Sequence, residues 1–234
     1  MFAKAPRTGT VKTRLIPTLA PSQAAQLAGA FIADLAERLA ALARALGAVA
    51  IVFYTPADAA DEIAALAGDL RREPQRGRDL GERLTSMLRM LGREGFEHVA
   101  VVGSDAPTLP DAAIAHAFAA LEDGDVAIAA AADGGYVLLA LRGLHVALFE
   151  RIPWSTPAVY AVTLERARRA GLHVVELPAW WDVDDGISLE RLRHEFAADR
   201  STPAPRTRAM LEAFTRAAPA AAPATSKARK IVPQ

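Results

Sequence analysis

The sequence predicts an α/β protein with a mostly parallel mixed sheet and helices on both faces. Apolar runs of strand composition alternate with helical segments along the chain. One run, residues 99–102, is rich in valine and bounded by glycine, as is typical of a strand buried on both faces. A hairpin signature, Asp133-Gly134-Gly135, adds an antiparallel element.

The first half of the chain begins with an apolar stretch at residues 1–5, which predicts the end of a first strand. Such a strand is short, because strands usually run about five or six residues. Residues 21–46 carry leucines at helical spacing, and Gly47 ends that helix. The other segments up to residue 121 are strands at 49–54, 70–74 and 99–102 and helices at 57–67, 79–91 and 111–121.

The second half predicts three strands at 125–131, 136–141 and 173–177 and two helices at 156–170 and 187–196. We expect residues 1–200 to form one domain. Residues 201–217 are then a proline-containing linker and a short helix. Residues 218–234 are rich in alanine and proline, and we expect this tail to be disordered.

Composition excludes several classes of protein. Lysine plus arginine equals aspartate plus glutamate, 27 each, so no long-range field favours nucleic acid or a membrane surface. The chain has no cysteine, which excludes disulfides, thiolate metal sites and cysteine nucleophiles. No apolar stretch approaches the roughly 20 residues of a membrane span. We expect a cytoplasmic protein that does not bind nucleic acid, and its oligomeric state stays open.

Asp105 is the first candidate for chemistry. It follows the valine-rich strand directly, and the carboxyl ends of strands in open α/β sheets are where ligands bind. A carboxylate there is suited to holding a divalent cation on a phosphate. Ser104-Asp105-Ala106-Pro107 is also an ordinary turn sequence, so a purely structural role remains open.

A basic loop follows the first strand. Lys4, Lys12 and Arg14 lie within it, and Gly9 allows the backbone to approach a ligand closely. The loop follows a strand and precedes a helix, which favours phosphate binding over a merely solvated basic loop. It is not a Walker P-loop, because Val11 precedes the lysine where that motif requires glycine.

A second acidic cluster is Asp182-Val183-Asp184-Asp185. In an extended segment Asp182 and Asp184 face the same way, and like charges so close repel unless a cation or a proton intervenes. Together with Asp105 they are candidates for ligands of Mg²⁺ or Mn²⁺. Asp185 has a simpler interpretation as the cap of the helix that follows.

Three further segments have weaker signals. Asp133-Gly134-Gly135-Tyr136 suits a loop lining a substrate site, or only a hairpin turn. Gly81 lies in a segment that either caps a helix or approaches a nucleotide base. Trp154 offers an aromatic wall, although capping by Ser155 or Thr156 explains that segment equally well.

Taken together, these segments resemble one family. The motifs occur in its order: 2–6 with Gly9 and 11–15, then 80–83, 103–107, 133–136, 154–156 and 182–184. The chain is thereby similar to the bacterial GT-A-type radical-SAM/selenodomain-associated transferases, also described as arsenosugar-biosynthesis-associated glycosyltransferases. That family is related to the nucleotide-diphospho-sugar transferases. The resemblance covers roughly residues 1–192.

The resemblance implies a Rossmann-like GT-A fold, with Lys12 and Arg14 on phosphate and Asp105 and Asp184 as metal-side acids. It extends substrate binding to the motif residues Lys4, Gly9, Gly81, Asp133, Gly134, Gly135, Tyr136 and Trp154. Two departures affect these assignments. Alanines precede Asp133 where the family has Gly-Pro, and Asp185 and Ser188 replace a threonine and an acid after Asp184.

Three functions follow as hypotheses. The first is a metal-dependent transferase with a nucleotide-activated donor, most simply a glycosyltransferase acting on a small molecule. Asp105 and Lys12 would then carry the chemistry, with Asp182 or Asp133 as the base on the acceptor hydroxyl. The second is a nucleotidyltransferase similar to guanylyltransferases, which releases pyrophosphate. The third is a non-catalytic nucleotide-binding protein.

Overall fold

The computed structural model describes residues 1–217 of the 234-residue chain. Its backbone alternates strands and helices as the sequence predicts. In order they are β1 (Phe2–Lys4), η1 (Thr13–Leu15), α1 (Pro21–Leu46), β2 (Ile51–Thr55), α2 (Ala60–Ala67), β3 (Arg71–Pro74), α3 (Leu80–Arg93), β4 (His98–Val102), α4 (Asp111–Ala120), β5 (Val126–Ala131), β6 (Tyr136–Arg142), η2 (Val146–Phe149), α5 (Val159–Arg169), β7 (Val174–Trp180), α6 (Gly186–Ala198) and α7 (Pro205–Ala217). The predicted tail at 218–234 lies outside the described residues.

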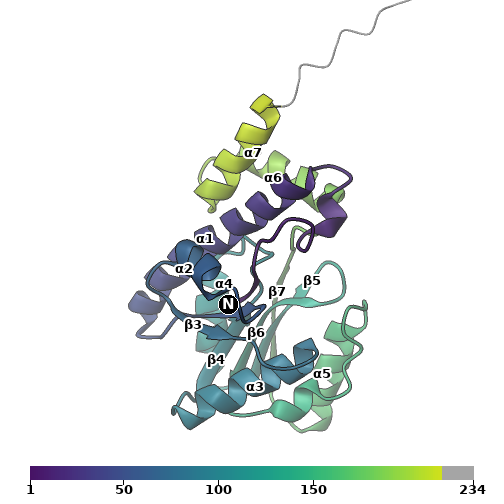
Figure 1. Ribbon diagram of the computed structural model, residues 1–234. Helices are drawn as coiled ribbons and strands as arrows, with labels where there is room; N and C mark the ends of the chain where they lie inside the picture. The colour runs from purple at the N-terminus through teal and green to yellow at the C-terminus, as the bar shows by residue number, and fades with distance from the viewer. Residues whose placement is uncertain (218–234) are drawn as a thin grey trace, which may run out of the picture.

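Two sheets share one plane of the fold (Figure 1). Strands β1, β2 and β3 form a three-stranded parallel sheet, and β4, β6, β5 and β7 form a four-stranded one in that order. A single parallel bridge, Phe2 to Gly103, joins β1 to the end of β4. Among the paired strands, β6 alone runs antiparallel to its neighbours. The expected mostly parallel mixed sheet is therefore confirmed.

Helices cover both faces of the sheet, because successive strand residues point to opposite sides. On one face α1, α2 and α4 pack around Ala3, Val52 and Val102. On the other, α3, η2 and α5 pack around Phe53 and Ile128. A third apolar cluster joins the start of α1 to η1, α6 and α7, at the upper end of Figure 1.

Local signals fix three of the helix ends. Gly47 takes the left-handed conformation after α1, with φ of 65°. Asp79 accepts a hydrogen bond from the Glu82 amide at 2.8 Å and so caps α3. Asp185 caps α6 in the same way through the Ser188 amide. The predicted cap at 155–156 is wrong: α5 begins after Ala158, which makes no side-chain cap.

The predicted double burial of the valine-rich strand is only partly right. In β4 Val99 and Val102 are buried, whereas Ala100 and Val101 are half-buried. The physical reason is that β1 begins at Phe2, so within residues 1–217 most of β4 has no strand on the side opposite β6. None of the helices in residues 1–217 is both long and apolar enough to cross a bilayer.

Candidate active site

The loop after β1 carries Lys12 inward. Lys12 itself has left-handed backbone angles, φ 48° and ψ 40°, at the start of η1. This conformation is unusual for a residue with a side chain. It turns the lysine toward the Phe31 ring of α1, with 5.9 Å from Nζ to the ring centroid, and leaves the side chain only 5% exposed. A buried ammonium of this kind needs negative partners.

Two carboxylates supply those partners. The Nζ atom of Lys12 lies 2.8 Å from Asp105 Oδ1 and 2.8 Å from Asp184 Oδ1. Asp105 follows β4, and Asp184 lies between β7 and α6. The predicted convergence of a basic loop and two acids at the carboxyl edge of the sheet is thus present in the structure.

A backbone bond holds the two acidic segments together. The Val183 amide donates to the Asp105 carbonyl at 2.8 Å, so the chain after β7 is pinned to the chain after β4. The Asp184 amide donates to Ser188 Oγ at 2.9 Å. Ser188 was not among the predicted site residues. Its position as the third residue of a helix capped by Asp185 is the signal that could have identified it.

The charge state of this cluster is set by competing effects. Burial lowers the pKa of the Lys12 ammonium, but the charges of Asp105 and Asp184 and their hydrogen bonds outweigh it, so the pKa lies above its ordinary value. Lys12 therefore stays protonated at neutral pH. The two carboxylates keep 49% and 38% of their side-chain surfaces exposed, so a ligand can reach both.

Arg14 extends the positive charge outward. Its guanidinium lies 3.8 Å from Asp184 Oδ2, and its side chain is 74% exposed. Such an ion pair is weak in water, and the side chain can turn toward a bound anion at little cost. The other predicted loop residues have local contacts: Lys4 Nζ donates to the Thr10 carbonyl at 2.7 Å, and Gly9 takes φ of 75° in the turn.

Asp182 lies beside this cluster with a different environment. Burial, followed by the negative charges of Asp184 and Asp133, raises its pKa to about 6. Asp133 has a structural bond as well, because its Oδ1 accepts from the Gly135 amide at 2.9 Å. A general base works best with a pKa near the operating pH, and the raised pKa of Asp182 fits that role.

The β5–β6 hairpin carries the next predicted segment. Gly134 has φ of 89°, and a Cβ there would lie 2.2 Å from the Pro157 carbonyl oxygen, so only glycine fits. The Tyr160 amide donates to the Gly134 carbonyl at 2.9 Å. The hydroxyl of Tyr136 is buried without a hydrogen-bond partner among the described residues, and burial raises its pKa. The contacts of Gly134 with Pro157 and Tyr160 hold the hairpin against the start of α5.

Gly81 and Trp154 form a separate contact. A Cβ on Gly81 would lie 2.7 Å from the Phe149 carbonyl oxygen and 2.8 Å from Trp154 Nε1, so the glycine lets the indole pack on the first turn of α3. Within residues 1–217 no hydrogen bond or ion pair links this contact to Lys12. Its predicted role in substrate binding stays a prediction.

The donor set for a divalent cation consists of two carboxylates. No group of three or more His, Cys, Asp or Glu side chains in the described part of the chain is arranged to hold a metal. Mg²⁺ is commonly held by one or two carboxylates and completed by substrate phosphates and water. Asp105 and Asp184 fit that pattern, because both are partly exposed and their Oδ1 atoms share one cationic partner.

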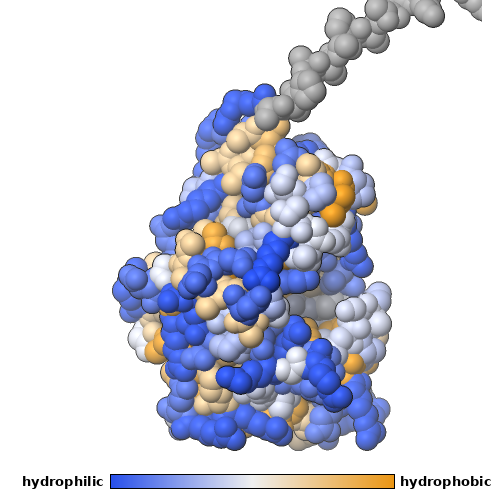
Figure 2. Space-filling view, in the orientation of Figure 1, coloured by the Kyte–Doolittle hydropathy of each residue, from blue (hydrophilic) through white to orange (hydrophobic). Residues whose placement is uncertain are grey.

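The surface around the site is mostly hydrophilic. Figure 2 shows a largely hydrophilic face with a hollow near its centre, in the area where Figure 1 places the loop after β1 above α3. Positive and negative side chains balance over the whole chain. Binding of an anion therefore depends on local groups such as Lys12 and Arg14.

Comparisons with known proteins agree with this architecture. A family model described as "Uncharacterized protein conserved in bacteria (DUF2064)" matches residues 34–156. A crystal structure from Desulfovibrio desulfuricans G20, of a protein provisionally named a nucleotide-diphospho-sugar transferase, is 33% identical. That match covers 92% of this chain and 93% of the other, with a TM-score of 0.84. A search of curated proteins finds no match.

More distant structures share the fold alone. A CMP:2-keto-3-deoxy-manno-octonic acid synthetase complexed with CTP is 14% identical, covers 84% of this chain and 96% of its own, and has a TM-score of 0.54. A cytidylyltransferase from Leptospira borgpetersenii serovar Hardjo-bovis is 13% identical, covers 92% of each chain and has a TM-score of 0.52.

Proposed function

This chain belongs to the DUF2064 family, and on that basis we propose that it is a metal-dependent transferase that uses a nucleotide-activated donor. The preferred reaction is glycosyl transfer to a small-molecule acceptor. We further propose that, within the family, the chain groups with the radical-SAM/selenodomain-associated, arsenosugar-related transferases, because its motifs from Phe2 to Asp184 resemble theirs. The 33% identity to the Desulfovibrio protein supports the transferase class.

One observation carries the proposal. A buried lysine and two partly exposed carboxylates from distant parts of the chain meet within 2.8 Å at the carboxyl edge of the sheet. An ordinary structural ion pair has no need of two acids on one lysine with both acids open to solvent. A site for a cation on a diphosphate uses one or two such carboxylates at the carboxyl ends of strands, and a neighbouring lysine adds positive charge for the phosphates.

In the proposed reaction Lys12 and Arg14 stabilise negative charge that develops on the leaving phosphate. Asp105 and Asp184 would hold Mg²⁺ or Mn²⁺, which would supply Lewis-acid stabilisation of the same diphosphate. Because Lys12 is protonated and held from both sides, its charge is already oriented before the donor binds. This preorganisation lowers the cost of reaching the transition state.

Asp182 is our candidate for the base on the acceptor hydroxyl. Its raised pKa and its position two residues before Asp184 support that role. Asp133 stays the alternative, although its bond to the Gly135 amide fits a turn-forming role. The segment 133–136 would then line the acceptor side of the site.

The proposal is tested by a ligand screen followed by a variant. Nucleotides and nucleotide sugars are screened by thermal shift with and without Mn²⁺, because a ligand bound only by the native state raises the melting temperature. Transfer is then measured with the best donor. Asp105→Asn should lower turnover at least about a hundredfold and weaken its dependence on Mn²⁺.

Asp58→Asn provides the matched control. Like Asp105, Asp58 is an aspartate with an exposed carboxylate that pairs with a basic side chain of the loop after β1: its Oδ1 lies 3.1 Å from the Arg7 guanidinium. Its substitution should leave turnover within about threefold of the wild type, as expected for an exposed ion pair. If Asp105→Asn left turnover and metal dependence unchanged, the proposal would be wrong.

Nucleotidyl transfer is the second candidate function. A buried, permanently charged Lys12 in the loop after β1 suits the stabilisation of departing pyrophosphate. The assay is incubation with nucleoside triphosphates and acceptors, followed by measurement of pyrophosphate. Its release would favour this function. Binding of a nucleotide sugar without pyrophosphate release would favour glycosyl transfer.

A further inference from the structure

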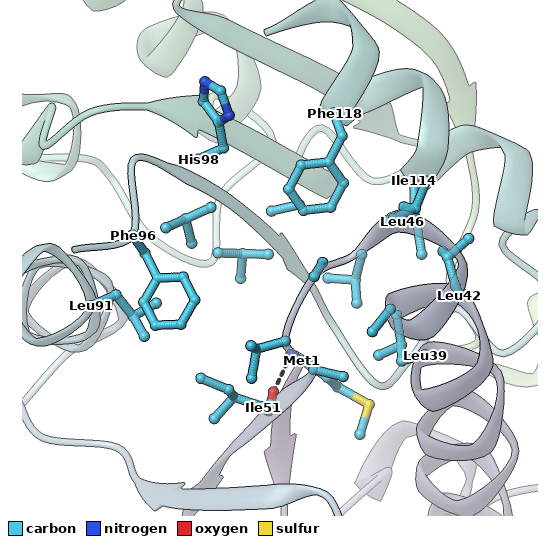
Figure 3. A pocket seen from close by; sticks show the side chains of 18 of the residues that line it. Met1, Leu39, Leu42, Leu46, Ile51, Leu91, Phe96, His98, Ile114 and Phe118 are labelled. Carbon is cyan, nitrogen blue, oxygen red and sulfur yellow. Dashed lines mark hydrogen bonds between the residues drawn. The ribbon is translucent and has the colours of Figure 1, made fainter. Parts of the chain in front are cut away.

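An apolar cavity lies at the opposite end of the sheet from Lys12. Its volume is about 450 Å³ (Figure 3). Met1 and Ile51 form its floor, and Leu39, Leu42 and Leu46 of α1 line one side with Ile114 and Phe118 of α4. Leu91 and Phe96 line the other side. The cavity thus separates the two helical layers at a place where a strand would normally do so.

Beside this cavity, the edge of β4 that faces away from β6 is unpaired in the described part of the chain. Strand β4 starts five residues before Gly103, which bridges Phe2, yet β1 extends no further back than Phe2. Along β4, residues 98–102 pair with β6 and with no second strand among the described residues. The half-burial of Ala100 and Val101 reflects this open edge.

The hydrogen bond at Met1 continues the sheet ladder. Its amino group donates to the Ile51 carbonyl at 2.8 Å, and the Phe53 amide donates to the Met1 carbonyl at 2.8 Å. This is the pairing that a peptide amide makes in a parallel ladder. A terminal ammonium has three donors and a charge, and here it is buried with that one carbonyl as its partner within the described residues.

We propose that this cavity is the seat of three or four apolar residues that precede Met1 in the native protein and extend β1 between β2 and β4. The register sets the length. Phe2 pairs with Phe53, so the third residue before Met1 falls opposite Val49. Phe2 also bridges Gly103, so the same residue falls opposite Val99. Three added residues, together with Met1, extend the three-residue β1 to seven residues, within the usual range of about 3–10 residues for a strand.

The lining sets the chemistry of the segment. Phe2 belongs to the cluster with α3, and Met1 to the cluster with α1 and α4. The residue immediately before Met1 therefore faces Leu91 and Phe96, and the one before that faces Leu39 and Phe118. Both sides are apolar, so the segment is apolar at every position, as in a strand covered on both faces.

The first experiment is to determine the amino terminus of the protein isolated from its native host, by intact mass and terminal sequencing. We expect at least three residues before Met1, most of them apolar. A native chain that begins at Met1, or one that carries a polar segment there, would overturn the proposal.

The second experiment compares recombinant chains that differ only before Met1. One begins at Met1, one carries Met-Val-Val-Val in front of it, and one carries Met-Gly-Ser-Gly as the matched control. The valine extension should raise the melting temperature by at least about 5 °C and the control by much less. We also expect the cavity of the unextended chain to bind 8-anilinonaphthalene-1-sulfonate, and the valine extension should abolish the fluorescence of the bound dye.

Other occupants of the cavity give different results. If a free apolar ligand or a second copy of the chain fills it, the valine extension gives no more stability than the glycine-serine extension. A second copy would in addition make the melting temperature depend on protein concentration. Either result would contradict the proposal and leave the proposed function intact, because Lys12, Asp105 and Asp184 do not line this cavity.

Discussion

Lys12 Nζ lies 2.8 Å from Asp184 Oδ1, although 172 positions of sequence separate the two residues. This contact links the loop after β1 to the segment after β7. Asp105, at the end of β4, is the second carboxylate that contacts Lys12 Nζ. Four predictions follow from this site and from the two ends of the sheet.

Loss of the Lys12 charge should act on turnover more than on binding. Lys12→Met keeps an unbranched side chain in the same space and removes the positive charge, so turnover should fall by about 10²–10³-fold. The donor should still bind through Arg14 and the remaining loop. Steady-state kinetics with the identified donor measures both.

Arg7→Met is the control for the Lys12 variant. Arg7 belongs to the same loop, but it pairs with Glu62 at 2.6 Å and with Asp58, away from Asp184. Turnover of this variant should stay within about threefold of the wild type. If turnover fell equally in Lys12→Met and Arg7→Met, the charge of Lys12 would have no specific role, and both substitutions would act by disturbing the conformation of the loop.

Asp182→Asn should stabilise the protein at pH 7 and abolish efficient turnover. The folded-state pKa of Asp182, about 6, lies above the ordinary 3.8, so the folded state binds more protons between these pH values. Its ionisation therefore lowers the free energy of unfolding as pH rises through 4 to 6. With a discount for its partial exposure, the gain at pH 7 should be about 1–2 kcal/mol.

Urea unfolding of the metal-free protein at pH 4 and pH 7 tests this sign. The free energies of unfolding of the wild type and Asp182→Asn should differ at pH 7 and become equal near pH 4. Asp185→Asn is the control, since the pKa of Asp185 is lowered by its hydrogen bonds to the Ser188 amide and hydroxyl. That variant should not stabilise the fold. A destabilised Asp182→Asn would show that the carboxylate is structural.

The two glycines of the β5–β6 hairpin should differ sharply. Gly134→Ala places a Cβ 2.2 Å from the backbone oxygen of Pro157 at a φ of 89°, and should cost about 2–4 kcal/mol of unfolding free energy. In Gly135→Ala the nearest atom is Asp133 Oδ1 at 3.1 Å, in a side chain that can move, so the cost should be about 1 kcal/mol or less. Equal effects would mean that the contact with Pro157 does not constrain the hairpin.

The chain that begins at Met1 should lose stability as pH falls from 8 to 5. Burial lowers the pKa of the Met1 amino group from 8.0 to about 5, so the unfolded state binds more protons over that interval. The free energy of unfolding should rise with pH by up to about 4 kcal/mol between pH 5 and 8.

The chain extended with Met-Val-Val-Val isolates this contribution. Its amino group lies beyond the cavity floor, while Glu97 and His98, the titratable side chains that line the cavity, are the same in both chains. The pH dependence of the difference between the two chains then reports the Met1 amino group alone. A difference that does not change with pH would show that burial does not lower the pKa of this amino group.

Several elements were predictable because their signals are local. Helix α1 ends at Gly47, and α3 and α6 begin after Asp79 and Asp185, because a capping or left-handed residue acts on its own neighbours. The Asp133-Gly134-Gly135 turn is of the same kind. One incomplete prediction had a non-local cause: the half-burial of Ala100 and Val101 depends on where β1 begins.

The carboxyl-terminal helix shows a further limit of sequence reasoning. Asp34 is buried in α1, and it accepts hydrogen bonds from the amides of Arg206 and Thr207 at 3.0 and 2.8 Å. Nothing near residue 205 in the sequence indicates that partner. The predicted domain boundary at residue 200 stays a prediction, although α7 lies against α1 in the structure (Figure 1).

The sequence by itself determined the alternation of strands and helices, most of their ends, and which side chains could bind a phosphate or a cation. It did so because hydrophobic period, capping and residue chemistry are properties of short segments. Only the tertiary structure decided that Lys12 bridges Asp105 and Asp184, that Asp182 has a raised pKa, and that an apolar cavity lies beside Met1 and β4. These depend on the distance and solvent exposure of groups far apart in the chain, and chain folding alone sets both.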